Sequence, residues 1–152
     1  MNTTNYWICD KCGKKITSTQ DGWVEWLIPT KDNFPETHNK GIRIVHAVDC
    51  LYSDGECERA DAIPGDASLE NFCGPDGLMD LLQFISDDMF ENKEEVLEII
   101  KRIHIPGYEV ARNYIDDAIS EGIYEPNTKE SYCSQRNIQK IIEFSQKLEQ
   151  ER

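Results

Sequence analysis

The sequence predicts an α+β fold, in which a small β module precedes a C-terminal helical part of about four helices. Three observations support this prediction. Aromatic and β-branched residues form two strand-like runs in the first third of the chain. Apolar residues recur at helical spacing in the second half. An acidic stretch with few apolar residues separates them. We therefore divide the 152 residues into a β module (1–52), an acidic linker (53–76) and a helical domain (77–152).

The β module contains two candidate strands. Residues 23–28, WVEWLI, are aromatic and β-branched, and they end before Pro29. Residues 42–45, IRIV, follow Gly41. The stretch between them, residues 29–41, is polar and contains two prolines, so we expect a hairpin loop there.

Cysteine and histidine residues flank these strands at the spacing of metal ligands. Cys9 and Cys12 form a C-x-x-C pair before Gly13, and His46 and Cys50 follow the second strand. Zinc binds four nitrogen or sulfur ligands in a tetrahedron, and glycine allows the positive φ that closes such a turn. We expect one structural zinc ion, held by Cys9, Cys12, His46 and Cys50. The strand–loop–strand between the ligand pairs resembles the layout of zinc ribbons and treble clefs.

Other interpretations of these residues remain open. A thioredoxin-like redox pair is disfavoured because no βαβ pattern surrounds Cys9 and Cys12, but free thiols are an alternative. Cys57 in place of His46 would make a four-cysteine site, and His38 in the polar loop is a further alternative ligand.

The charge of the chain is distributed unevenly. The net charge is −13, yet residues 1–50 carry six acidic and six basic residues. The excess acid lies in the linker and the helical domain, which disfavours nucleic acid as a partner. Lysines beside the C-x-x-C pair suit a zinc ion with three thiolates, whose net charge is −1.

Targeting signals are not apparent in the sequence. The first residues lack a basic segment followed by an apolar run, and no apolar stretch approaches ~20 residues. Three of the six cysteines remain after zinc binding, and this odd number argues against a disulfide framework. We expect a cytoplasmic protein that does not contact a membrane.

The helical domain shows four helical patterns. We expect helices over residues 76–90, 93–104 and 108–121, with Gly122 ending the third. Ser134 is a candidate N-cap for a final helix.

Several stretches of the chain resemble a group of small, uncharacterised bacterial proteins with an N-terminal C-x-x-C…H-x-x-x-C zinc-binding module. The similar stretches are residues 7–14, 21–26, 44–46 together with Cys50, 74–79 and 105–112. The resemblance implies that both halves of the chain belong to one design of bacterial or phage cytoplasmic origin. It implies no activity.

No sequence motif indicates an enzyme. The chain lacks HExxH, a P-loop and a Gly-x-Gly-x-x-Gly segment, and a zinc with four protein ligands has no open position. We expect a non-enzymatic protein-interaction or regulatory module with a protein partner. An acidic nucleic-acid mimic, which would inhibit a nucleic-acid-binding protein, is the alternative, and a nucleic-acid-binding zinc module is a further one.

Overall fold

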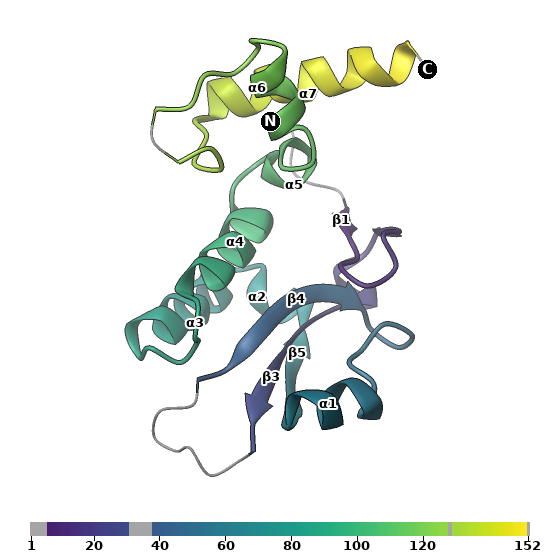
Figure 1. Cartoon of the computed structure of the whole chain (residues 1–152), viewed down its shortest axis with the longest axis vertical. Coiled ribbons are helices and arrows are strands. Elements are labelled where there is room, and N and C mark those ends of the chain that lie inside the picture. The colour runs from purple at the N-terminus through teal and green to yellow at the C-terminus, as the bar shows by residue number, and fades with distance from the viewer. Residues whose placement is uncertain (1–5, 31–37, 128, 152) are drawn as a thin grey trace. The chain divides into compact units, whose positions relative to one another are not determined.

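A computed structural model of the chain describes residues 6–30, 38–127 and 129–151 (Figure 1). Its contacts divide the chain into two compact units at the bond between His104 and Ile105. We refer to residues 6–104 as the N-terminal unit and to residues 105–151 as the C-terminal unit. Antiparallel sheets lie only in the N-terminal unit among the described residues, and helices occur in both units, so the predicted α+β class is confirmed.

The main sheet has three antiparallel strands in the order β4-β3-β5. The central strand β3 spans Gly22–Pro29, β4 spans Lys40–His46 and β5 spans Ala62–Ser68. In the central strand, Trp23 pairs with Val45 on one side and with Ser68 on the other. Both predicted strands are therefore confirmed, whereas most of the expected hairpin loop falls on residues 31–37, outside the described residues.

The structure differs from the expected linker over residues 53–76. Helix α1 (Asp54–Ala60), strand β5 and helix α2 (Leu69–Phe72) occupy this segment. A capping box starts α1, because Ser53 Oγ accepts from the amide of Glu56 and the Glu56 carboxylate accepts from the amide of Ser53. An edge strand such as β5 pairs with its neighbour through the backbone, and an edge position tolerates residues such as Pro64 and Gly65.

A second, two-stranded sheet lies near the start of the N-terminal unit. Strands β1 (Trp7–Ile8) and β2 (Lys15–Ile16) pair antiparallel, and the 3₁₀ helix η1 (Thr19–Asp21) leads into β3. The turn between β1 and β2 carries Cys9 and Cys12. The short sheet therefore positions the C-x-x-C pair.

Helices α3 (Pro75–Ser86) and α4 (Lys93–His104) complete the N-terminal unit. The second of them has the predicted bounds. Helix α3 ends before residue 90, because Asp88 takes a positive φ and the chain turns so that Phe90 is buried. The unit's core joins the sheet to both helices, with an aromatic cluster of Trp26, Phe72, Phe84 and Phe90.

The C-terminal unit consists of helices α5 (Tyr108–Ala111), α6 (Ile115–Ser120) and α7 (Gln135–Gln150). The single helix predicted over residues 108–121 is thus divided in two, because Tyr114 adopts φ −126° and ψ 5°, outside the helical range. Ser134 caps α7 as predicted by accepting from the amide of Asn137. A separate apolar core holds these helices together, and it includes Tyr108, Ala111, Ile115, Ile138, Ile141 and Ile142.

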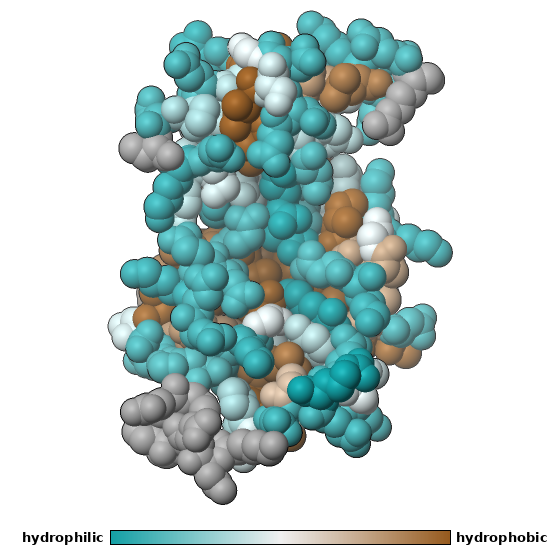
Figure 2. Space-filling model, in the orientation of Figure 1, coloured by the Kyte–Doolittle hydropathy of each residue, from teal (hydrophilic) through white to brown (hydrophobic). Residues whose placement is uncertain are grey.

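Hydrophilic residues cover most of the face shown in Figure 2, and the apolar residues on it form small, separate patches. Within the described residues, none of the helices has the length and apolar character needed to cross a membrane.

Candidate metal centre

The structure brings together the four ligands expected from the sequence. The sulfur atoms of Cys9, Cys12 and Cys50 and a ring nitrogen of His46 all lie within 4.8 Å of one another. Nδ1 of His46 lies 3.4 Å from Sγ of Cys12 and 3.7 Å from Sγ of Cys50. Nitrogen and sulfur ligands on one tetrahedral zinc ion are ~3.6 Å apart, as follows from the usual zinc–ligand bond lengths. The cluster therefore has the dimensions of a zinc site.

Backbone hydrogen bonds shape the turn that carries Cys9 and Cys12. The amide of Cys9 donates to the carbonyl of Lys14 (2.9 Å), and the amide of Gly13 donates to the carbonyl of Cys9 (3.0 Å). The amide of Lys11 points at Sγ of Cys9, 3.4 Å away. Gly13 has φ 75°, a conformation that a side chain would strain. Both thiols of the turn are thus presented on the same side without strain.

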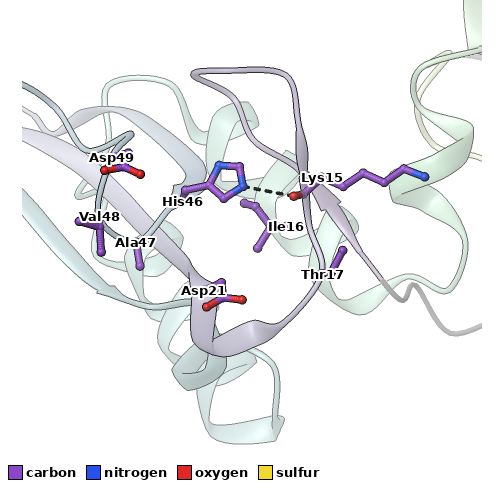
Figure 3. A pocket seen from close by; sticks show the side chains of 8 residues that line it. All are labelled: Lys15, Ile16, Thr17, Asp21, His46, Ala47, Val48 and Asp49. Atoms are coloured by element: carbon purple, nitrogen blue, oxygen red, sulfur yellow. Dashed lines mark hydrogen bonds between the residues drawn. The ribbon is translucent and has the colours of Figure 1, made fainter.

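His46 ends strand β4, and the backbone around it determines which ring nitrogen faces the cluster. Its Nε2 lies 3.2 Å from the carbonyl oxygen of Lys15, as the dashed line in Figure 3 shows. A carbonyl can only accept, so Nε2 carries the hydrogen and the lone pair of Nδ1 points at the sulfur atoms. Such a carbonyl contact orients metal-binding histidines and fixes their tautomer.

Cys50 is positioned by a buried polar network that begins on the central strand. Glu25 is fully buried and accepts from Nε of Arg43 at 2.7 Å. Nη2 of Arg43 donates to the carbonyl of Cys50 (3.2 Å), and the amide of Tyr52 donates to the Glu25 carboxylate (2.9 Å). The Arg43 guanidinium also lies 3.7 Å from the centroid of the Tyr52 ring. The chain on both sides of Leu51 is therefore tied to β3 and β4.

The thiols differ in acidity because of their surroundings. Burial raises the pKa of Cys9, but hydrogen bonds from backbone amides, those of Cys12 and Lys11 first, outweigh burial and lower it to about 6. Burial and hydrogen bonding to Cys9 and Cys12 raise the pKa of Cys50 to about 11. Three thiolates at this distance repel one another, whereas a divalent cation stabilises all three. The donor set therefore fits a zinc ion.

The two alternative ligands lie outside the cluster. Cys57 is buried on α1, where it packs with Leu27 and Ala62. His38 pairs with Asp88, with 3.4 Å between Nε2 and Oδ2. Neither joins the cluster of Cys9, Cys12, His46 and Cys50.

Two lysines next to the cluster have partners. Nζ of Lys11 lies 3.2 Å from Oε1 of Glu56, and Nζ of Lys15 lies 4.4 Å from the centroid of the Tyr6 ring. The Lys15 side chain accordingly extends away from His46 in Figure 3. Two of the lysines near the candidate metal ligands are therefore already engaged, one in an ion pair and one in a cation–π contact.

A pocket of about 250 Å³ lies next to His46, which forms part of its lining. Its walls come from β2 and η1 and from the turn between the ligands His46 and Cys50 (Figure 3). Val48, Asp21 and Asp49 are among the residues that line the pocket, and Val48 is 82% exposed. The surface next to the cluster thus combines an exposed apolar side chain with two acids.

The four residues of the cluster are predictable from the sequence, but the charged residues that hold them in place are not. Glu25 stands in the middle of an otherwise apolar strand, which was the available signal for a buried charge. Its partner Arg43 stands in the second strand in the same way. The pairing of Asp10 with Arg102 joins residues too distant in the sequence for any local pattern to reveal.

No protein-family model matches the chain, and no curated protein or solved structure is significantly similar to it. The resemblance to small bacterial zinc-binding proteins is supported only as far as the clustering of the four ligands, and membership of that group stays a prediction.

Proposed function

We propose that the chain is a non-enzymatic protein-interaction module whose N-terminal unit is held together by one structural zinc ion. The observation that supports this most is the cluster of three sulfur atoms and one imidazole nitrogen within 4.8 Å. Zinc sites of this composition are usually structural and contribute directly to folding free energy.

Four protein donors support a structural role over a catalytic one. A catalytic zinc has three protein ligands and keeps its fourth position for water or substrate. Here the fourth donor, Cys50, is buried and is held through its carbonyl by Arg43. Displacing it for water would disturb the Glu25 network as well as the metal shell.

The surface around the cluster supports a protein partner over nucleic acid. Lys11 is paired with Glu56, and Asp21 and Asp49 line the neighbouring pocket. Nucleic-acid affinity depends on free cations that neutralise phosphates. Val48, largely exposed, instead offers an apolar contact of the kind that protein interfaces bury.

The metal can be tested first. We expect one zinc ion per chain by native mass spectrometry and elemental analysis of protein purified without chelator. Cys12→Ser should lose most of the metal, whereas Cys133→Ser, in the C-terminal unit, should retain it. Wild-type protein that neither contains zinc nor takes it up would overturn the proposal.

The partner is tested with a surface variant that leaves the metal ligands intact. Cross-linked complexes of zinc-loaded protein, recovered from cell extract, should disappear in Val48→Asp and persist in Ile63→Asp, a matched change at an exposed residue of β5. Zinc content should be the same in both variants. Identical capture by wild type and Val48→Asp would contradict a role for this surface.

An acidic nucleic-acid mimic is the second candidate, favoured by the net charge of −13. This alternative predicts that binding to a nucleic-acid-binding partner weakens steeply as salt concentration rises. Binding that is insensitive to salt would exclude the mimic and leave the interaction module.

A further inference from the structure

Asp10 lies between the two thiols of the first turn and joins that turn to strand β4. Its amide donates to the carbonyl of Ile44 (2.8 Å), and its Oδ2 accepts from the amide of Ile44 (2.8 Å). Ile44 precedes the ligand His46 by two residues on the same strand. These two hydrogen bonds therefore fix the C-x-x-C turn against the strand that supplies the third ligand.

Arg102, in the last turn of α4, holds the same carboxylate from the other side. Its side chain is 2% exposed, and Nη1 lies 2.7 Å from Oδ2 of Asp10. Its Nη2 donates to the carbonyl of Ile8 (2.9 Å), and its own carbonyl accepts from Nε1 of Trp7 (3.1 Å). Residues on both sides of Cys9 are thus bound to one residue of α4.

Charge gives this contact a specific role beside a metal. A zinc ion with three thiolates and a neutral imidazole has a net charge of −1, and the Asp10 carboxylate adds a second negative charge next to it. The Arg102 guanidinium is buried and compensates that carboxylate, which is 27% exposed. Removing the guanidinium would leave the carboxylate without its counter-charge next to the negatively charged zinc–thiolate group, and like charges at short range repel each other.

We propose that Asp10 and Arg102 form a positioning pair for the metal centre, which makes helix α4 part of that centre. The inference rests on the proposed zinc binding. Arg102 holds Asp10, Asp10 sets the distance between the first ligand pair and His46, and the cluster is preorganised for a tetrahedral ion. By linkage, a bound metal stabilises the C-terminal end of α4 by the same coupling free energy.

Metal affinity and the cobalt spectrum test this role together. Zinc affinity is measured by competition with a chromophoric chelator, and the d–d absorption of the cobalt(II)-substituted protein reports the ligand geometry. Arg102→Met should weaken zinc binding about 10- to 100-fold, the usual effect of losing an outer-shell partner, and should shift the cobalt spectrum. Arg102→Lys should recover part of the affinity, because a lysine keeps the charge without the two-pronged geometry.

Asp10→Asn tests the pair from its accessible side and keeps the test valid if Arg102→Met fails to fold. It should weaken binding as Arg102→Met does, and the double variant should bind no more weakly than the weaker single variant. Arg136→Met, the same change at an exposed position of α7, should bind as wild type does.

The outcomes separate this inference from the proposed function. Wild-type protein that fails to bind zinc or cobalt would overturn the metal centre itself. Wild type that binds, with Asp10→Asn and Arg102→Lys of unchanged affinity and spectrum, would overturn the positioning pair alone. Weakened affinity with an unshifted cobalt spectrum would also overturn it, because the pair would then act on stability without positioning the ligands.

Discussion

The two units bury different kinds of groups. The N-terminal unit contains the Cys/His cluster and two ion pairs, the buried pair Glu25–Arg43 and the pair Asp10–Arg102, in which the arginine is buried. Among the described residues of the C-terminal unit there is no such cluster, and its core consists of apolar contacts between α5, α6 and α7, although Glu109 is buried there as well. The first unit therefore combines an apolar core with polar geometry and a candidate metal centre, whereas the second relies on an apolar core.

Loss of the metal should produce the largest difference in stability between the two units. Cys9→Ser is expected to unfold the N-terminal unit, including α3 and α4, because structural zinc contributes on the order of 10 kcal/mol to folding in small domains. Hydrogen exchange followed by mass spectrometry should show lost protection up to His104 and retained protection in α7. Cys133→Ser serves as the control. Equal loss of protection in both units would contradict the expectation that only the N-terminal unit needs the metal.

A cavity in the core of the C-terminal unit should destabilise that unit and leave the N-terminal unit unchanged. Ile141→Ala removes a fully buried side chain of α7 and should lower the free energy of unfolding of the C-terminal unit by about 3 kcal/mol. Zinc affinity should stay at the wild-type value. Ile123→Ala, at a residue 39% exposed, should have a much smaller effect in the same denaturant titration. A drop in zinc affinity would show that the units are coupled.

The Glu25 network tests whether polar geometry matters within the N-terminal unit itself. Glu25→Gln leaves the Arg43 guanidinium without its anion and should cost about 3 kcal/mol, as expected for breaking a buried ion pair. Zinc affinity should fall too, because Arg43 also holds the carbonyl of Cys50. Glu58→Gln, on the exposed side of α1, should change neither quantity. If zinc affinity were unchanged in Glu25→Gln, the Glu25 network would contribute to the stability of the fold and not to metal binding.

Removing a helix cap should have the smallest effect on stability, and the effect should stay within one unit. Ser53 caps α1 in the N-terminal unit, and Ser134 caps α7 in the C-terminal unit. Each serine-to-alanine change should cost about 1 kcal/mol, confined to its own unit, as seen by hydrogen exchange. An effect of Ser53→Ala that spreads to α7 would contradict independent units.

Local patterns in the sequence were sufficient for the elements that have a local cause. The two strands around Glu25 and Arg43, helix α4 and the Ser134 cap follow from periodicity and capping chemistry. The four ligands follow from spacing and from the coordination preference of zinc.

Tertiary pairing explains what the sequence did not reveal. The sequence predicts a linker where β5 forms, because Pro64 and Gly65 lie there within a largely acidic segment. The backbone pairing of β5 with β3 is not visible in composition. Arg102 has the ordinary position of a basic residue in the last turn of a helix, where its charge also suits the helix dipole. Only the folded chain shows that its guanidinium contacts Asp10.

The separation of 92 residues between Asp10 and Arg102 has a consequence for how the protein is made. The cysteine turn leaves the ribosome early, and the two other candidate ligands, His46 and Cys50, follow long before α4 is synthesised. Closing a loop of this length carries a large entropic cost, which a nascent chain cannot offset until the helix exists. We expect a chain arrested before Arg102 to hold zinc more weakly than the finished protein, so that α4 secures the metal late in biosynthesis.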